Sequence, residues 1–216
     1  IKQYAAELGI EIVGEEYVTL DSDDWTTQVA KIADVKPDFV FNTINGSSNV
    51  GFIKAYTEAG LGADNSPIIS VSIAEEEAPA MGADLTGQYA SWNYFQSVEN
   101  PENEVFIKAF QDKYGADRPT SDPMEAAYVS MYLYKNMVEK AGSFCVDSVN
   151  EASDGVTFQA PEGLVTVNGD NHHIAKTGLI GQINAENQFD IVWDSGEPIE
   201  PDPYLEAYSW WNPDAE

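Results

Sequence analysis

Cysteine and cationic side chains are scarce in this chain of 216 residues. Its only cysteine, Cys145, excludes an intramolecular disulfide, and the acidic neighbour Asp147 would not activate the thiol, so we interpret Cys145 as buried filler. Arg118 is the only arginine, and 10 basic residues are outnumbered by 37 acidic ones, which gives a formal net charge of −27. Such a chain repels the phosphates of nucleic acids and of anionic lipids, which argues against nucleic-acid binding.

Long apolar runs are absent as well. No stretch approaches the roughly 20 residues that a membrane-spanning helix requires, so we expect no direct membrane span in these residues. The chain starts at Ile1 inside a helical pattern, without an initiator Met or an N-cap residue. We interpret this start as a cut and expect a longer protein, whose N-terminal region would carry any export signal or membrane anchor.

Acidic residues are spread along the whole chain instead of gathering in one tail. Salt screens the repulsion between carboxylates, and carboxylates keep a surface hydrated, so the composition favours adaptation to a salt-rich environment. An ordinary acidic protein is the alternative. A hydrophobic content of 43% with 12% aromatic residues indicates a folded chain despite the charge.

Helical and strand patterns alternate in the first part of the chain. Gly9 is a typical helix end, and the polar residues 21–24 are typical of a helix start. The order helix, strand, helix, strand, helix, strand is predicted for residues 1–8, 10–20, 25–35, 38–43, 49–60 and 67–73. This αβαβαβ order predicts an α/β fold with a doubly wound parallel sheet.

The pattern changes after residue 77. Residues 87–96 are predicted to form a long aromatic strand that crosses between lobes, and two amphipathic helices follow at 103–114 and 121–141. Asp122 is the predicted N-cap of the second helix, with Pro123 as its first residue. A period of two then predicts an antiparallel meander with strands at 163–168, 174–184 and 188–193. The tail after residue 195, rich in proline and acid, is expected to pack as an irregular strap.

Small polar residues follow the two short apolar strands at 38–43 and 67–73. Asn45, Gly46 and Ser47 come after the first strand, and Ser72 lies at the end of the second. Neighbouring parallel strands end at one edge of a sheet, where ligands bind. No nucleophile–base pair, metal-ligand cluster or phosphate loop accompanies these residues, so we predict binding of a small polar molecule without catalysis, cofactor or metal. A plain turn that caps the next helix is the alternative.

The acidic run at 75–77 has three interpretations: a solvated helix start, an acid/base or metal pair, and a ligand carboxylate. No histidine lies near it in the sequence, and consecutive side chains diverge, which argues against the pair. Glu75, nearest the strand end, is the carboxylate that would accept N–H groups of a ligand. Asp122 would face a ligand from the other lobe, although its capping role is explanation enough. The pair at 172–173 is interpreted as a structural turn, since adjacent histidines point apart and no further metal ligand accompanies them.

Several blocks in sequence order resemble the urea-binding components of bacterial ABC transporters. The relation extends more loosely to amide-binding regulators of amidase operons and to branched-chain amino-acid binding proteins. The blocks that carry the resemblance are Asn-Thr-Ile-Asn-Gly-Ser-Ser-Asn at 42–49, Ser-Val-Ser-Ile-Ala-Glu-Glu-Glu at 70–77, Trp-Asn-Tyr-Phe-Gln-Ser at 92–97, Thr-Ser-Asp-Pro-Met-Glu-Ala-Ala-Tyr at 120–128 and Asn-His-His at 171–173, together with the acidic, proline-rich closing stretch at 196–204. The heavy acidity and Gly51, early in a helix, depart from the family pattern.

This resemblance implies the type I periplasmic-binding-protein fold, in which a ligand is trapped between two hinged lobes. It also implies that the chain lacks most of the first lobe. Residues 1–90 would form the second lobe, 91–154 the C-terminal share of the first lobe, and 155–216 the antiparallel strands and tail that return to the hinge and second lobe.

The function implied by the resemblance is capture of urea, or a short-chain amide, and its delivery to an ABC transporter permease from the periplasm or the extracellular side. Ligand contacts would come from Asn45, Gly46, Ser47, Ser72, Ala74, Glu75 and Asp122. A cytoplasmic amide sensor of the same fold and a branched-chain amino-acid binding protein are the alternatives. A hydrolase that uses the glutamate run is a third hypothesis, and we predict that the protein is not an enzyme.

Overall fold

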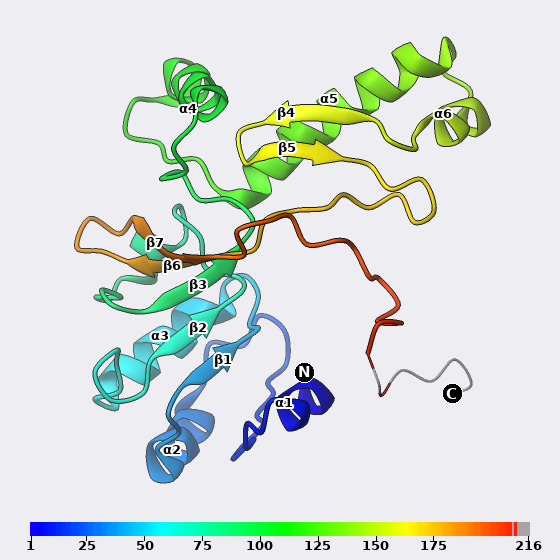
Figure 1. Ribbon diagram of the computed structural model, residues 1–216. Coiled ribbons are helices and arrows are strands. Elements are labelled where there is room, and N and C mark those ends of the chain that lie inside the picture. Colours follow the sequence, from blue (N-terminus) through cyan, green and yellow to red (C-terminus); the bar gives the residue numbers. More distant parts are fainter. Residues whose placement is uncertain (209, 211–216) are drawn as a thin grey trace.

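The computed structural model describes residues 1–208 and 210 of the chain. Its elements form two groups, and each group has an apolar core of its own. Figure 1 shows one group around a twisted sheet and the other around a long helix. The predicted tail lies partly outside the described residues, at 209 and 211–216.

The first group is built on a five-stranded mixed sheet with the order β1-β2-β3-β6-β7. The strands β1 (Val40–Asn42), β2 (Ile68–Ser70) and β3 (Tyr89–Trp92) are parallel, whereas β6 (Leu179–Ile183) and β7 (Phe189–Asp194) are antiparallel to their neighbours. The predicted α/β class is therefore confirmed. The sheet is mixed because the chain returns to it as a tight β6–β7 hairpin, which joins antiparallel strands without a helical crossover.

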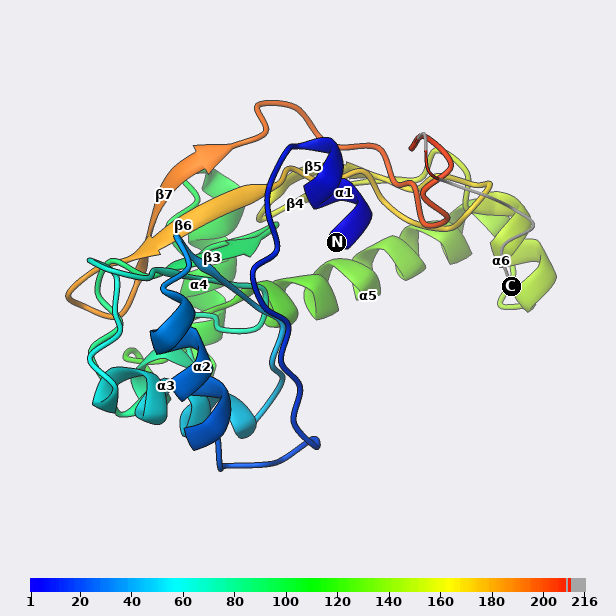
Figure 2. The same ribbon diagram turned by 90° about the horizontal axis from the view of Figure 1, so that it is seen from below.

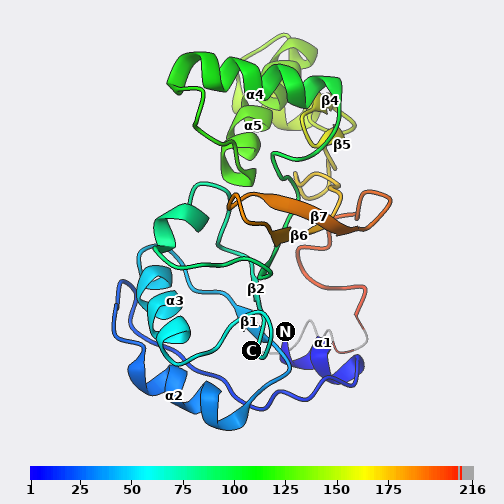
Figure 3. The ribbon, with the colours of Figure 1, turned by 90° about the vertical axis from the view of Figure 1, so that its left-hand side faces the viewer.

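Helices lie on both sides of this sheet. Figures 2 and 3 show α2 (Thr26–Val35) and α3 (Ser48–Glu58) on one side and the short α1 (Lys2–Glu7) on the other. Phe52 and Tyr56 of α3 stand one turn apart and pack with Trp25 as the aromatic centre of the core. A 3-10 turn, η1 (Ala78–Met81), adds Ala78 and Met81 to the same core.

The second group consists of α4 (Pro101–Tyr114), α5 (Asp122–Ala141), α6 (Val146–Ala152) and the hairpin of β4 (Thr157–Ala160) and β5 (Gly163–Thr166). Val129 and Leu133, one turn apart on α5, pack against Val156 and Val165 of the hairpin region. This second core therefore joins α5 to β4 and β5.

The chain passes between the two groups more than once. It leaves the sheet after Trp92, enters α4 at Pro101, and returns between Thr166 and Leu179. The tail then runs back alongside the return segment, where Lys176 and Ile199 form an antiparallel bridge. The predicted domain boundaries, 1–90, 91–154 and 155–216, stay predictions. The two cores show that β4 and β5 pack on α5, whereas β6 and β7 belong to the sheet.

Two expectations about elements fail wholly or in part, and two elements were not foreseen. Residues 10–20 form no strand, because β1 pairs with β2 alone in the described chain, and a strand needs a neighbour for its backbone groups. The meander is only partly right: β6 and β7 pair antiparallel as predicted for 174–184 and 188–193, but β5 pairs with β4 instead of β6. The short α6 and the strand β4 have no counterpart in the predicted elements.

Two residue assignments need correction as well. Cys145 is exposed, because it caps α6 at the surface, and it is not filler. Ser121, not Asp122, is the N-cap of α5, since Ser121 has extended backbone angles and Asp122 is already helical. Across residues 1–208 and 210, no helix combines the length and apolar character that crossing a bilayer requires.

Candidate ligand-binding site

The carboxyl ends of β1 and β2 lie side by side, because Asn42 pairs in register with Ser70. Behind this edge is a polar network of buried side chains. The amide nitrogen of Asn42 donates to Asn49 Oδ1 at 3.0 Å, and Asn49 Nδ2 donates to the Ile44 carbonyl at 2.8 Å. Ser72 Oγ accepts a bond from Asn49 Nδ2 at 3.3 Å and donates to the same carbonyl. The network fixes the loop at 43–47 against the end of β2.

Four of the predicted ligand residues meet at this edge. Asn45, Gly46 and Ser47 lie in the exposed loop, one to three residues beyond the carbonyl that Ser72 contacts. Gly46 has φ +64°, which a glycine adopts without strain, and nothing lies within 4 Å of the place a Cβ would take. Ser47 donates to Asp21 at 3.3 Å, and Asn45 makes one long bond of 3.4 Å to the Thr43 carbonyl. The loop therefore keeps most of its hydrogen-bonding capacity for solvent or a ligand.

Ala74 and Glu75 lie below the surface. The Ala74 N–H donates to Glu77 Oε2 at 2.9 Å, so this backbone group is occupied. The Glu75 side chain is buried, and its Oε1 accepts the Gln96 N–H at 2.6 Å. Burial raises the pKa of Glu75 to about 8, because charge is disfavoured away from water. Glu75 thus contacts the crossing segment after β3 and does not line the open edge.

Asp122 lies where α5 meets that crossing segment. Its Oδ2 accepts the backbone N–H groups of Asn93 and Tyr94, both at 3.0 Å. The neighbouring Ser121 donates to Glu76 Oε1 at 2.7 Å. The structure thus gathers Asn45, Gly46, Ser47 and Ser72 at one edge and places Ala74, Glu75 and Asp122 around the contact between the two groups of elements.

Three further residues at this contact were not foreseen. Glu125 is fully buried one turn beyond Asp122, and its Oε1 accepts the Glu162 N–H at 3.2 Å. Glu162 forms an ion pair with Lys176 at 3.0 Å. The spacing of Asp122 and Glu125 on one helix face was the available signal, but their partners are distant in the sequence. Asn42 and Asn49, which shape the loop, were likewise missed as site residues.

Metal binding has no support in the described chain: residues 1–208 and 210 contain no group of three or more His, Cys, Asp or Glu side chains that could hold an ion. His172 has φ +58° in the loop before the Ile174 bridge, and His173 Nδ1 lies 2.8 Å from the Asn171 carbonyl. This local turn geometry is what the sequence predicted for the histidine pair.

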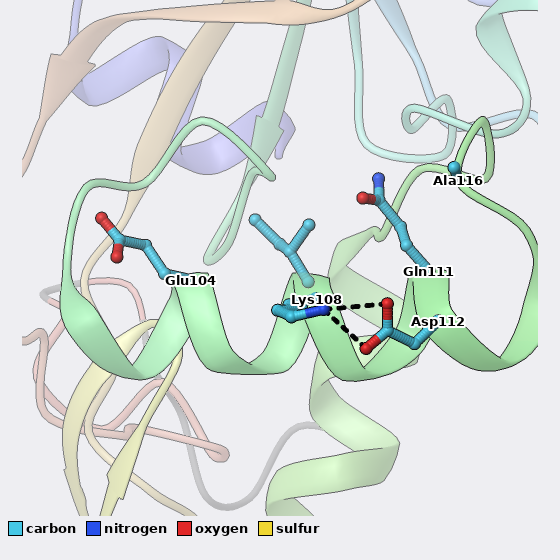
Figure 4. A pocket seen from close by; sticks show the side chains of 6 residues that line it. Glu104, Lys108, Gln111, Asp112 and Ala116 are labelled. Carbon is cyan, nitrogen blue, oxygen red and sulfur yellow. Dashed lines mark hydrogen bonds and ion pairs between the residues drawn. The ribbon is translucent and has the colours of Figure 1, made fainter.

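Two surface hollows lie away from the predicted edge. One, of ≈ 390 Å³, follows a face of α4, where Lys108 forms an ion pair with Asp112 at 2.7 Å, as Figure 4 shows. Another, of ≈ 450 Å³, lies between α1 and the segment at 10–15. Neither is lined by a predicted ligand residue. Asn45, Gly46 and Ser47 are exposed at the edge of β1 and β2, so a closed pocket there would need a second wall opposite it.

A mixed sheet with helices on both sides, a second α/β group and repeated crossings between them define the α/β architecture of type I periplasmic binding proteins. The model of the periplasmic binding protein domain family matches residues 1–209, and the chain belongs to that family. The predicted kinship is confirmed at this level. The urea specificity stays a prediction.

Individual relatives share this architecture. The chain is 26% identical over 182 residues to the Leu/Ile/Val-binding protein homolog 6 of Brucella melitensis, covering 82% of this chain and 46% of that protein. A limonene hydroxylase of Geobacillus stearothermophilus is 33% identical over 119 residues, which cover 55% of this chain and 22% of that protein. The chain thus spans less than half the length of these curated relatives.

Solved structures agree on the fold. A solute-binding protein of an ABC transporter from Rhodopseudomonas palustris HaA2, in complex with p-hydroxybenzoic acid, has a TM-score of 0.83 at 22% identity, over 96% of this chain and 58% of that one. The leucine-, isoleucine-, valine-, threonine- and alanine-binding protein of Brucella ovis, in its closed conformation, has a TM-score of 0.76 at 17% identity, over 93% and 54% of the two chains. At these identities the likeness shows the fold alone.

Proposed function

We propose that this chain is part of a solute-binding protein that captures urea, or a short-chain amide, and delivers it to an ABC transporter permease. The observation that carries the proposal is the chemistry of the edge at β1 and β2. Asn45, Ser47 and Ser72 offer amide and hydroxyl groups there, and neither 43–49 nor 70–77 contains a lysine, arginine or histidine. This edge of the sheet therefore suits an uncharged polar ligand.

Urea has one carbonyl acceptor and two NH2 groups. Asn45 supplies both a donor and an acceptor, and the hydroxyls of Ser47 and Ser72 can do either. Each buried polar group of the ligand that lacks a partner costs about 1–3 kcal/mol, so a matched set of small side chains gives specificity. The opposite wall would come from the remainder of the first lobe, and hinge closure would bury the ligand.

A branched-chain amino acid is the second candidate. The family relationship favours it, since the Brucella melitensis relative is named a Leu/Ile/Val-binding protein homolog. Glu76 lies where the two groups of elements meet. One of its carboxylate oxygens accepts a hydrogen bond from Ser121, and the other has no hydrogen-bond partner among the described residues. A free carboxylate oxygen of this kind would suit the ammonium group of an amino acid.

We also propose that the protein binds without catalysis and works outside the cytoplasm. A cytoplasmic amide sensor of the same fold is the alternative, and an export signal in the complete protein would decide between the two. Ammonia release during incubation with urea would indicate a hydrolase and would overturn the binding-only proposal. No step of the proposal requires a cofactor.

Calorimetry of the complete protein with urea, acetamide, leucine and 4-hydroxybenzoate tests the ligand assignment. The test variant is Asn45→Ala, because the Asn45 side chain makes only one long hydrogen bond. Loss of a buried ligand hydrogen bond worth about 1–3 kcal/mol weakens affinity roughly 5- to 150-fold. The control, Asn150→Ala, removes an exposed amide on α6 and should leave affinity unchanged.

The outcomes are distinct. Heat with urea or acetamide, reduced in Asn45→Ala alone, supports the proposal. Binding of leucine with no response to either amide favours the amino-acid candidate. Equal affinity in Asn45→Ala and the native protein removes the 43–47 loop from the site.

A further inference from the structure

Carboxylates far outnumber cations where the two groups of elements touch. Besides Glu76, four acidic side chains lie there, and one lysine accompanies them. We call these five residues the junction cluster: Glu75, Asp122, Glu125, Glu162 and Lys176. Three of the acids, Glu75, Asp122 and Glu125, have at most 9% of their surface exposed, and the Glu162 side chain has 2%. A buried site with this composition cannot hold every carboxylate in its charged form at low cost.

The central pair of the junction cluster is Glu125 and Glu162. Glu125 belongs to the first turn of α5, and Glu162 lies in the turn between β4 and β5. Glu125 Oε1 accepts the Glu162 N–H at 3.2 Å, while Glu125 Oε2 has no hydrogen-bond partner among the described residues. Neither oxygen of the Glu162 carboxyl group has a hydrogen-bond partner among the described residues. The Glu125 carboxyl group is thus held against the backbone of Glu162, and three carboxyl oxygens of the pair lack a hydrogen-bond partner among the described residues.

Lys176 connects this pair to the segment that returns to the sheet. Its Nζ lies 3.0 Å from Glu162 Oε1, and the lysine side chain has 18% of its surface exposed. The next residue, Thr177, accepts a hydrogen bond from Asn93 Nδ2 at 2.9 Å. Asn93 in turn donates its backbone N–H to Asp122. Both crossing segments are therefore attached to the start of α5 through the junction cluster.

The charge balance requires a proton. One lysine compensates one carboxylate, so ionising both Glu125 and Glu162 would leave an uncompensated buried charge. Burial, followed by the charge of Glu162, raises the pKa of Glu125 to about 8, and burial also raises the pKa of Glu162. The charge of Asp122, on the same helix, also raises the pKa of Glu125, whereas the positive charge of Lys176 lowers it.

The remaining titratable groups around the pair do not supply a cation. Burial raises the pKa of the hydroxyl groups of Tyr94, in the first crossing segment, and Tyr128, on α5, and the charge of Glu125 adds to the rise in each case. Glu75 interacts with Asp122 from the loop after β2. Every group that faces the pair, apart from Lys176, is thus neutral or acidic at neutral pH.

We propose that Glu125 and Glu162 share one proton and that its release to solvent at mildly alkaline pH loosens the contact between α5 and the crossing segments, changing the arrangement of the two groups of elements. This pH-dependent change depends only on the junction cluster and does not require the proposed ligand. In the protonated form, one carboxyl group bonds the other while Lys176 holds the pair. In the deprotonated form, two carboxylates compete for one lysine, and their repulsion separates the hairpin turn from α5.

Carboxyl carbon NMR of protein with labelled glutamate tests the shared proton. The two signals are assigned by their loss in Glu125→Gln and Glu162→Gln. We expect both signals to shift together as the pH rises from 7 to 9, and we expect the Glu162 midpoint to fall below pH 6 in Glu125→Gln, where Lys176 faces a single carboxylate. Two signals already fully ionised at pH 7, or a Glu162 midpoint that ignores the Glu125 substitution, would overturn the proposal.

Distances between spin labels test the conformational step. Labels at Glu58→Cys on α3 and Glu151→Cys on α6, in a Cys145→Ser background, report on the two groups, and both positions are exposed. The distance distribution should change between pH 7 and 9 in the labelled protein that retains Glu125 and Glu162. It should remain fixed in the labelled Glu125→Gln variant, because glutamine imitates the protonated carboxyl group. The matched control is Glu139→Gln, an exposed change on the same helix, which should respond as the native protein does.

A distribution that does not respond to pH in the native protein contradicts the switch. So does a Glu125→Gln protein whose distances change with pH as the native distances do. If Glu125→Gln fails to fold, Glu162→Gln provides the same comparison from the other carboxyl group and should also lose the pH response.

Discussion

Asn49 supports the loop that carries the proposed ligand contacts. Its amide accepts a bond from Asn42 at 3.0 Å and donates to the Ile44 carbonyl at 2.8 Å and to Ser72 at 3.3 Å. Only 1% of the residue is exposed, so water cannot replace these bonds when the amide is removed. Asn45, four residues earlier, is exposed and almost unbonded. The two asparagines therefore separate support of the loop from contact with a ligand.

We predict that Asn49→Leu lowers the free energy of unfolding by about 1–3 kcal/mol, because the Asn42 amide and the Ile44 carbonyl lose buried partners. Asn45→Ala should change it by less than about 0.5 kcal/mol, as surface substitutions usually do. Urea denaturation at fixed pH measures both. Equal stability of Asn49→Leu and the native protein would show that the network does not hold the loop.

Glu75 gives a second prediction for a single residue, this time about pH. Its pKa is raised from 4.5 to about 8 in the folded protein by burial. Between these two values the unfolded chain binds fewer protons than the folded one, so the stability contributed by Glu75 is fully present below about pH 4.5 and is lost as the pH rises through about 8. Each unit of pKa displacement corresponds to about 1.4 kcal/mol.

Glu75→Gln should therefore be more stable than the native protein at pH 8.5, by up to several kcal/mol, and equal or slightly less stable at pH 5. Glutamine keeps the acceptor for the Gln96 N–H and has no charge to desolvate. Denaturation midpoints of both proteins across this pH range provide the test, with the exposed Glu58→Gln as control. A stability difference that is the same at both pH values would contradict the assigned cause.

At the scale of elements, the packing of α3 explains a glycine that departs from the usual helix composition. Glycine inside a helix costs about 1 kcal/mol relative to alanine. A Cβ on Gly51, however, would lie 2.7 Å from Asp23 Cα and would also clash with the Asp23 carbonyl. The start of α3 thus packs directly on the backbone that precedes α2.

Gly51→Ala should destabilise the protein by about 1–3 kcal/mol even though alanine favours helices, because backbone atoms cannot move aside as a flexible side chain can. Gly62→Ala is the control, since nothing lies within 4 Å of its Cβ position. Thermal unfolding of the two variants makes the comparison. A Gly51→Ala protein as stable as the control would mean that α3 can shift away from Asp23.

The same elements show what could be predicted from the sequence. Helices α4 and α5 were foreseen within two residues at each end, because prolines at their starts and glycines at their ends act locally. The adjacency of β1 and β2 also followed from the connection through α3. Residues 10–20 have strand propensity but no neighbouring strand, and propensity alone cannot reveal whether a partner exists. The mixed sheet was missed for the same reason, since pairing depends on segments far along the chain.

The candidate site was likewise only partly predictable from the sequence. The 43–47 loop and Ser72 were foreseen because they immediately follow predicted strands. Glu125 and Glu162 were not, since they are 37 residues apart and only the folded chain brings them together. Glu75 was expected at the open edge, but its side chain turns towards Gln96 instead, a direction that the order of residues does not encode. Whether any of the predicted side chains contacts a ligand stays a prediction.

For the whole molecule, the dominant electrostatic fact is the excess of acid. Even if every basic residue were paired, the 37 acidic and 10 basic residues would leave 27 carboxylates without a cationic partner. Repulsion among them disfavours the compact state, and it acts over a Debye length of about 30 Å at 0.01 M salt, which shrinks to about 3 Å at 1 M. Exposed ion pairs such as Lys108–Asp112 contribute little in return.

We therefore predict that NaCl raises the melting temperature of this protein by several degrees between 0.01 and 1 M, most of it at low concentrations where screening changes fastest. The matched variant replaces four exposed glutamates with glutamine, at Glu11, Glu58, Glu151 and Glu186. It should melt higher than the native protein at low salt and gain less from added NaCl, because part of the repulsion is already gone. Sucrose stabilises proteins because it is excluded from their surface, and it does not screen charge. A comparison of sucrose with NaCl therefore distinguishes charge screening from general stabilisation by an excluded solute. If sucrose and NaCl raise the melting temperature alike, or if the variant gains as much from salt as the native protein, repulsion among carboxylates does not limit the stability of this fold.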